Sequence, residues 1–198
     1  MLTHVHYRSQ KFIIDLSNPL DISMPMEASI NNVNAWYLKE PIIKPVVIDN
    51  QIYTVAAGSS INFNNIKFNP HAHGTHTECV GHITKEKYSI NKCLKQFFFL
   101  AEVITVAPEN YKQDFIISKK QLQFALGNKK REALIVRTIP NTKDKLSKQY
   151  SNTNWPYFDR EAMTYLVRKG IKHLLIDLPS IDKENDCGEL VGHHVFWN

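Results

Sequence analysis

The chain has 198 residues and a formal net charge of +5, with 43% hydrophobic and 22% charged residues. This composition is ordinary for a globular protein, and it excludes a disordered, collagen-like or disulfide-rich chain. The length suits one domain with a sizeable core, so we expect a single domain over residues 1–198. The lysines are scattered and form no basic stripe, which argues against a nucleic-acid partner.

Signals for secretion or membrane insertion are also missing from the sequence. Residues 1–10 are polar and lack the apolar core of a secretory signal. The most apolar stretch, at residues 97–107, is shorter than the roughly 20 residues that cross a bilayer. Cys79, Cys93 and Cys187 are odd in number and have no redox or zinc-motif spacing, which favours free thiols in a reducing compartment. We therefore expect a cytoplasmic protein without a membrane partner.

Apolar runs bounded by turn residues predict strands in the first half of the chain, and helices and strands that alternate in the second. In chain order, the predicted elements are strands at 12–16, 42–48, 61–68 and 97–106, a helix from Ser118 to Leu126, a strand at 133–138, a helix from Asp159 to Gly170 and a strand at 171–178. Ser118 and Asp159 are typical N-caps, and glycine ends both helices. This order predicts an α/β domain with a mixed sheet and helices, rather than a regular doubly wound fold.

Histidines are concentrated in one short segment, which contains four of the nine in the chain. They are His71, His73, His76 and His82. In an extended segment, side chains two positions apart point the same way, so His76 and Glu78 would converge on one point. An imidazole nitrogen beside a carboxylate oxygen suits zinc or manganese rather than calcium. The segment therefore predicts a transition-metal site.

His82 can share that site only if the chain changes conformation after Glu78. In a continuous strand His82 would lie about 20 Å from His76. If the chain turns helical near Cys79, Glu78 and His82 become neighbours on one helical face. The alternative is a polar loop whose histidines form hydrogen bonds with the backbone. Cys79 could be a nucleophile beside His82, although an inert thiol is far commoner.

Three stretches of the sequence resemble one known family. His-Gly-Thr-His-x-Glu-x-x-x-His, at residues 73–82, resembles the His-x-Gly-Thr-His-x-Asp-x-Pro-x-His signature of the metal-dependent cyclase and kynurenine formamidase family, which includes isatin hydrolases. Residues 15–20, followed by Met24-Pro25, resemble the opening Asp-Leu-Ser-x-Pro-Ile of that family. Residues 176–182, with His193 after them, resemble its late Asp-x-x-Ser-x-Asp…His. The resemblance spans about residues 12–198.

The resemblance implies a swivelling β/β/α-type fold, a bound zinc or manganese ion and a homodimer or larger assembly. It implies hydrolysis of a small amide, either an aryl formamide such as N-formyl-kynurenine or a cyclic amide. Carried over by position, His76 is a metal ligand, Glu78 replaces a bridging aspartate, His82 is the catalytic acid/base and His193 is a late ligand. His71 and His73 complete the set of candidate ligands.

Several positions depart from the family pattern. Ala72 stands where the family has its first ligand, and either His71 or His73 could replace that ligand. Val80 stands where the family has proline. The last acidic or amide ligand has no counterpart, which indicates a shortened C-terminus. These departures leave open a second hypothesis, a catalytically impaired member that binds a small molecule or a metal.

Overall fold

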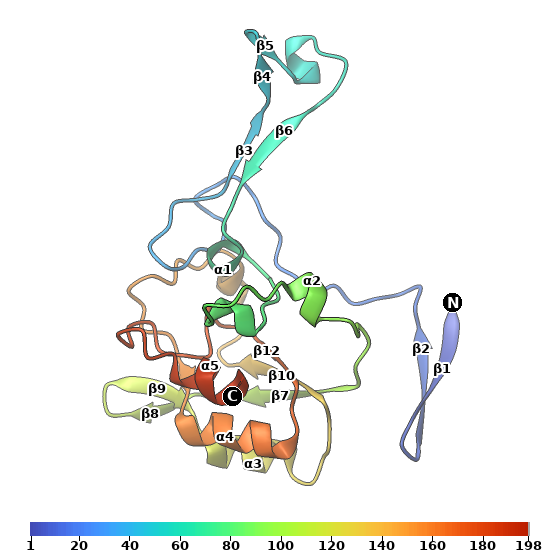
Figure 1. Cartoon of the computed structure of the whole chain (residues 1–198), viewed down its shortest axis with the longest axis vertical. Coiled ribbons are helices and arrows are strands. Elements are labelled where there is room, and N and C mark those ends of the chain that lie inside the picture. Colours follow the sequence, from blue (N-terminus) through green and yellow to red (C-terminus); the bar gives the residue numbers. More distant parts are fainter. Residues whose placement is uncertain (198) are drawn as a thin grey trace.

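The computed structural model describes residues 1–197, and a parallel three-stranded sheet lies in the main body of the molecule, in the lower part of the view in Figure 1. The strand order is β12–β10–β7, with bounds His173–Ile176, Ala133–Thr138 and Ala101–Val106. Residues 133–136 of the middle strand pair with both neighbours, so Ala133 lies opposite His173 on one side and Ala101 on the other. The α/β class predicted from the sequence is confirmed.

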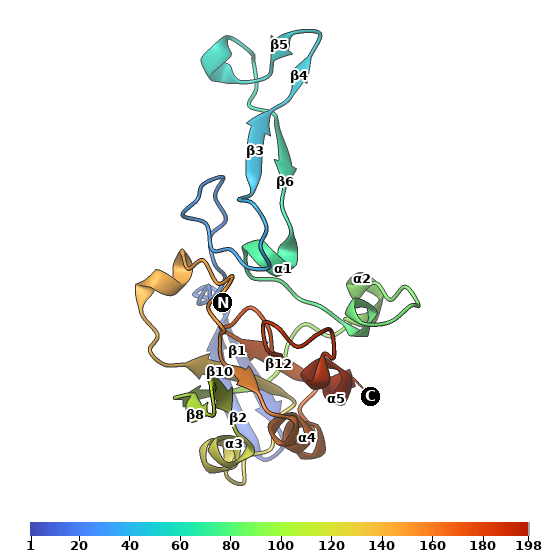
Figure 2. The ribbon, with the colours of Figure 1, turned by 90° about the vertical axis from the view of Figure 1, so that its left-hand side faces the viewer.

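Three helices pack on this sheet and on one another. They are α3 (Lys119–Leu126), α4 (Arg160–Lys169) and α5 (Val191–Trp197). Figure 2 shows α3 and α4 beside each other below the sheet. Leu122, Leu134, Met163 and Leu166 are fully buried in the core between sheet and helices, and Phe196 of α5 packs against the same core. The larger core cluster therefore belongs to the second half of the chain. A smaller cluster of Val33, Ala35, Tyr150 and Trp155 joins residues from the two halves.

Local signals define the helix ends where the sequence predicts them. Ser118 accepts a hydrogen bond from the backbone of Gln121, whose side chain bonds back to the Ser118 N–H, forming a capping box. Asp159 accepts from Ala162 at the start of α4, and Gly170 ends that helix in the left-handed conformation at φ 86°.

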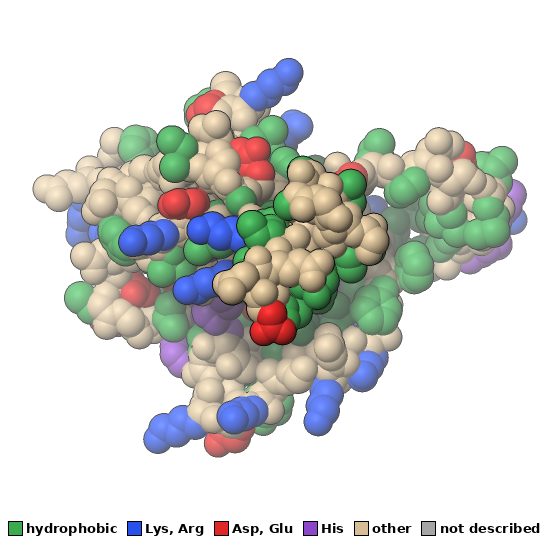
Figure 3. All heavy atoms as spheres, turned by 90° about the horizontal axis from the view of Figure 1, so that it is seen from above, with side chains coloured by type: hydrophobic (Ala, Val, Ile, Leu, Met, Phe, Trp, Pro, Cys, Tyr) green, Lys and Arg blue, Asp and Glu red, His purple; other side chains and the backbone are tan. Residues whose placement is uncertain are grey.

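The first half of the chain builds a long two-stranded arm that rises from the core (Figure 1). Its lower part pairs β3 (Ile42–Pro45) with β6 (Asn64–Lys67), and its tip pairs β4 (Val47–Ile48) with β5 (Gln51–Ile52) beside the turn η1 (Val55–Ala57). Figure 3 looks down on the arm and shows hydrophobic side chains on the surface around it and on a separate hairpin at one side. That hairpin is β1 (Leu2–Tyr7) and β2 (Gln10–Asp15).

The remaining elements are short. A second sheet has the order β11–β9–β8, with bounds Tyr157–Phe158, Asp114–Ile117 and Glu109–Tyr111. The short helices are α1 (Pro70–His73), η2 (Val80–His82), α2 (Ile90–Cys93) and η3 (Lys143–Leu146). Within residues 1–197, no helix combines the length and the apolar character needed to cross a membrane.

Several predicted strands are shorter in the structure than in the sequence analysis: the one predicted at 171–178 is limited to β12, and the one predicted at 42–48 is divided between β3 and β4. The strand predicted at 97–106 begins at Ala101, because its partner strand begins at Ala133. Residues 97–100 therefore have no strand with which to pair. Phe97 and Phe98 are consequently exposed. The strand predicted at 61–68 contracts to the four residues that pair with β3. An apolar run does not form a strand where no neighbouring strand is available for backbone pairing.

Candidate metal centre

The histidine segment takes three conformations in succession. It starts as α1, where the Asn69 side chain caps the helix by accepting the His71 N–H at 2.9 Å. It is then extended up to Cys79, and it turns into the 3-10 helix η2 immediately afterwards. The change near Cys79 that the sequence required is present, as a tight 3-10 turn. Its effect is to bring His82 back beside Glu78.

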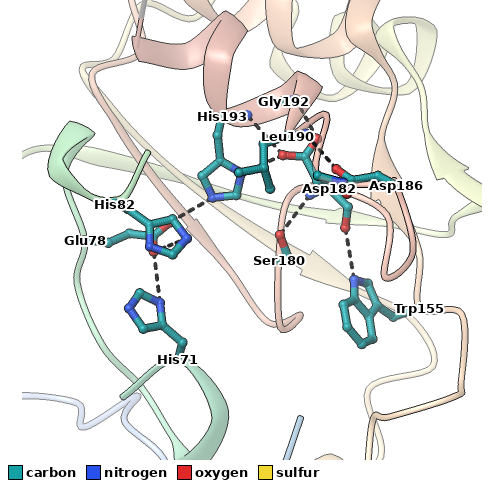
Figure 4. Close-up of polar contacts among 11 residues, drawn as sticks. His71, Glu78, His82, Trp155, Ser180, Asp182, Asp186, Leu190, Gly192 and His193 are labelled. Atoms are coloured by element: carbon teal, nitrogen blue, oxygen red, sulfur yellow. Dashed lines mark hydrogen bonds and ion pairs between the residues drawn. The ribbon is translucent and has the colours of Figure 1, made fainter. Parts of the chain in front are cut away.

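Glu78 lies at the centre of a ring of imidazoles (Figure 4). Its Oε2 is 3.3 Å from Nδ1 of His71 and 3.8 Å from Nε2 of His82. The same oxygen is 3.9 Å from Nε2 of His76, and Oε1 is 3.0 Å from Nε2 of His193. One ligand atom from each of His71, Glu78 and His82 lies within 4.8 Å of the others, so these three residues could hold a metal ion.

The five residues at the site come from two distant parts of the chain. His71, His76, Glu78 and His82 come from one short segment, whereas His193 comes from α5. Nδ1 of His76 lies 3.0 Å from the carbonyl of Gly74, and its Nε2 is the nitrogen nearer Glu78. Nδ1 of His71 faces Glu78, while its ring stacks on that of His82 with a centroid distance of 4.5 Å.

His73 is the one candidate ligand that the structure does not bring to the site. It is buried, its Nδ1 accepts the Asn69 N–H at 2.8 Å, and its Nε2 lies 2.9 Å from the Lys39 carbonyl. The helical turn of α1 directs His71 and His73 to different sides, which periodicity in the sequence could not decide while the conformation was unknown. Both nitrogens of His73 are occupied, so it anchors the base of the arm.

Asp182 fixes the orientation of His193. Its Oδ2 lies 2.5 Å from Nδ1 of His193, and its two oxygens also accept the backbone N–H groups of Gly192 and His193. The carboxylate therefore holds the start of α5 and the imidazole together. The backbone carbonyl of Asp182 accepts the indole N–H of Trp155, which is buried. This arrangement leaves Nε2 of His193 directed at Glu78 (Figure 4).

Sequence patterns offered only part of this scaffold. Of Asp177 and Asp182, which both follow β12, Asp182 is the one that contacts His193. Asp177 instead accepts from Thr138 and from Lys145, whose Nζ lies 2.7 Å away. Residue spacing does not identify Trp155 as a part of this scaffold, because a buried aromatic residue that donates to a loop carbonyl has no characteristic spacing.

The charges of the site follow from these contacts. Burial lowers the pKa of His193, but hydrogen bonds to Asp182 and Glu78 outweigh it and raise the pKa to about 9. Burial would raise the pKa of Glu78, yet the hydrogen bond from His193 and the nearby His82 hold it below its usual value. Burial, followed by repulsion from His76 and His82, lowers the pKa of His71. His71 is thus neutral near neutral pH, with a free lone pair.

The donor atoms fit a transition metal. They mix imidazole nitrogens with one carboxylate, which suits zinc or manganese. The Asp182–His193 pair has the form of the carboxylate–histidine arrangements that orient ligands in metal sites.

The sequence was compared with known protein families and with curated proteins. The model of the putative cyclase family matches residues 14–183. The chain belongs to the putative cyclase family. The match includes the whole histidine segment and Asp182, and it ends before His193. A comparison with curated proteins found no match. Membership supports an enzyme of the putative cyclase family, and the resemblance seen in the sequence is confirmed.

Proposed function

We propose that this chain is a metal-dependent hydrolase of a small amide. The observation that carries the proposal is the convergence of four imidazoles on Glu78 in a chain of the putative cyclase family. Neutral His71 and ionised Glu78 are the protonation states that metal ligands need, whereas His193, with a pKa of about 9, would have to release its proton before Nε2 could bind the ion.

The proposed ligands are His71 through Nδ1, His76 through Nε2 and Glu78, with His193 directed at the same point by Asp182. The ion would be zinc or manganese. When bound, it would supply Lewis acidity toward a carbonyl oxygen and lower the pKa of a water molecule. His71 takes the place that Ala72 leaves empty in the family pattern, since its ring is the one that faces Glu78.

His82 is proposed as the acid/base residue. Its Nε2 lies 3.8 Å from Glu78 Oε2, and its side chain is about one third exposed, so it can reach both the site and an incoming substrate. In that role His82 accepts a proton from the attacking water and delivers it to the leaving nitrogen of the amide. The same position would also let it act as a third ligand with His71 and Glu78. The two roles predict different metal contents for a variant that lacks the His82 imidazole.

Metal content and turnover, measured on the same preparations, separate these roles. His82→Ala is expected to keep most of its metal and to lose formamide hydrolysis by roughly 10²- to 10⁴-fold. His76→Ala is expected to lose both together. If His82→Ala loses metal as completely as His76→Ala, His82 is a ligand.

The substrate proposed first is an aryl formamide such as N-formyl-kynurenine, with cyclic amides as the second class. The assay therefore compares a formamide, a lactam and a lactone with metal restored. Metal binding without turnover of any of them would support the alternative, a family member that binds a small molecule or metal without catalysis. Location in the cytoplasm remains part of the proposal, based on the free thiols predicted from the sequence.

We further propose that two or more copies associate through the arm. Val47, Ile48, Phe63, Ile66 and Phe68 are each about half exposed on it. A two-stranded ribbon with exposed apolar side chains is marginal in water by itself. A second copy is the partner that covers such a surface in a homo-oligomer.

A further inference from the structure

Asn32 is a buried polar residue in the loop that precedes the arm. Only 2% of its surface is exposed. Its Oδ1 accepts the Glu27 N–H at 2.9 Å, and its Nδ2 donates to the carbonyls of Val33 and His73 at 2.6 and 2.9 Å. Both ends of the buried amide are therefore bonded, and these contacts fix its orientation.

The His73 carbonyl lies at the junction between the two parts of the histidine segment. His71 precedes it within α1, whereas His76 and Glu78 follow it in the extended part. The carbonyl of the last residue of a helix has no partner within that helix. Asn32 supplies the partner from a distant loop. Its amide therefore fixes the direction in which the chain leaves α1, and with it the placement of His71 relative to Glu78.

Asn32 is itself held by the part of the chain that follows η3. Gln149 Nε2 donates to the backbone carbonyl of Asn32 at 2.8 Å. The next residue, Val33, packs with Tyr150 and Trp155 in the smaller core cluster. The amide is thus fixed by buried packing that lies outside the histidine segment.

The smaller core cluster also supports the other half of the site. Trp155 donates its indole N–H to the backbone carbonyl of Asp182 at 3.1 Å, and the Asp182 carboxylate orients His193 (Figure 4). Asn32 and Trp155 therefore connect one cluster to the two distant parts of the chain that meet at Glu78.

We propose that Asn32 is a positioning residue of the metal centre. Its side chain holds the end of α1 against the smaller core cluster and so sets the placement of His71 relative to Glu78. The inference rests on the proposed function, because His71 and Glu78 are the proposed ligands. Its first test uses the metal-free protein, so the anchoring of the segment is measured whether or not an ion binds.

Two variants remove the donor. In Asn32→Asp the shape is kept and the Glu27 N–H still has an acceptor, but an oxygen replaces Nδ2 and faces the carbonyls of Val33 and His73. Asn32→Ala removes the same donor without adding a buried charge, so it supplies the test if the charge prevents folding.

Asn154→Asp is the matched control. It makes the same change of amide to carboxylate, but the Asn154 Nδ2 donates to Oδ1 of Asp114 at 2.9 Å rather than to the histidine segment. Any loss of general stability that follows from replacing a bonded amide is therefore present in the control as well.

The first measurement is amide hydrogen exchange in the metal-free protein. The N–H groups of Ala72 and His73 donate to the Asn69 carbonyl at 3.2 and 3.0 Å. Both should exchange about tenfold faster in the Asn32 variants, because the end of the short helix α1 loses a buried hydrogen bond. Asn154→Asp should exchange at the wild-type rate. Wild-type rates in the Asn32 variants would overturn the proposal.

The second measurement is the zinc affinity, obtained by competition with a chelator, together with the visible spectrum of the cobalt-loaded protein. The Asn32 variants should bind zinc about 10- to 100-fold more weakly. Their cobalt spectrum should change, since it responds to the geometry of the ligands. Asn154→Asp should match the wild type in both.

The two measurements separate the inference from the proposed function. Wild-type affinity and spectrum in the Asn32 variants would overturn the positioning role, even with faster exchange. A wild type that binds neither zinc nor cobalt would contradict the proposed hydrolase instead. In that case the exchange rates alone decide whether Asn32 holds the histidine segment.

Discussion

Asp182 lies 2.5 Å from His193, between Oδ2 and Nδ1, and the opposite nitrogen of that imidazole faces Glu78 at 3.0 Å. The imidazole is thus held between two carboxylates, one buried in the scaffold and one at the centre of the histidine cluster. Asp182 also receives two backbone N–H groups from the start of α5. The site and the helix that completes it therefore depend on one side chain.

Replacing Asp182 by asparagine should weaken metal binding without removing a ligand. The amide can still accept a backbone N–H, but it carries no charge to orient the imidazole of His193. We expect the affinity for zinc to fall about 10- to 100-fold, the usual effect of losing a partner behind a ligand. Competitive titration with a chelator measures it. Asp177→Asn is the control, since Asp177 binds Lys145 instead; equal losses in both variants would argue against a specific role for Asp182.

The metal-free protein should lose stability as the pH rises from neutral to alkaline. His193 has a folded-state pKa of about 9 against a usual value of 6.5. Its contribution is complete below pH 6.5 and is lost as the pH rises through 9. Up to about 3 kcal/mol of unfolding free energy should disappear over that window. Denaturant unfolding at several pH values measures it, and His193→Gln should flatten the profile. An unchanged slope in His193→Gln would assign the dependence to another group.

Sequence analysis predicted those features that depend on interactions between residues close together in the chain. Helix limits at Ser118, Asp159 and Gly170 depend on caps and on backbone conformation, both of which are readable from neighbouring residues. For His82 and Glu78, the spacing predicted that they could share a site only if the chain left the extended conformation near Cys79, and the structure has such a turn there. These parts needed no knowledge of distant packing.

The remaining features of the site and of the sheet depend on tertiary contacts between distant parts of the chain. The choice between His71 and His73 depends on the direction in which α1 turns, and the selection of Asp182 over Asp177 depends on where α5 packs. The length of β7 is set by where its partner strand begins, rather than by its own apolar run. None of these follows from residue spacing.

Gly192 should tolerate no side chain. A Cβ there would lie 2.9 Å from Oδ1 of Asp182 and 3.3 Å from Ile181, inside a buried contact. Gly192→Ala should therefore displace the carboxylate, cost about 1–3 kcal/mol of unfolding free energy and lower the pKa of His193. Thermal denaturation and histidine titration by NMR provide the two readouts. Gly74→Ala is the matched control, because a Cβ there meets nothing within 4 Å; equal destabilisation of both variants would refute the steric argument.

The arm should mediate self-association. Ile66→Asp places a charge on its exposed apolar surface, and this should shift the wild-type oligomer toward monomer. Phe124→Asp introduces the same charge at an exposed apolar position on α3, so it should leave the assembly intact. Light scattering at micromolar concentration measures the mass. A monomeric wild type would contradict the proposed self-association. Dissociation by Phe124→Asp but not by Ile66→Asp would place the interface at α3 rather than on the arm.

The central claim, a metal ion bound around Glu78 with His71 as a ligand, is tested most directly by metal content in a matched pair of variants. Elemental analysis of chelator-free preparations should find about one zinc or manganese per wild-type chain. His71→Ala should lose most of it, because the imidazole that faces Glu78 is removed. His73→Ala should keep it per folded chain while losing stability, because the His73 imidazole bonds Asn69 and Lys39 and not the site. Retention of metal by His71→Ala and loss by His73→Ala, or negligible metal in the wild type, would contradict the account.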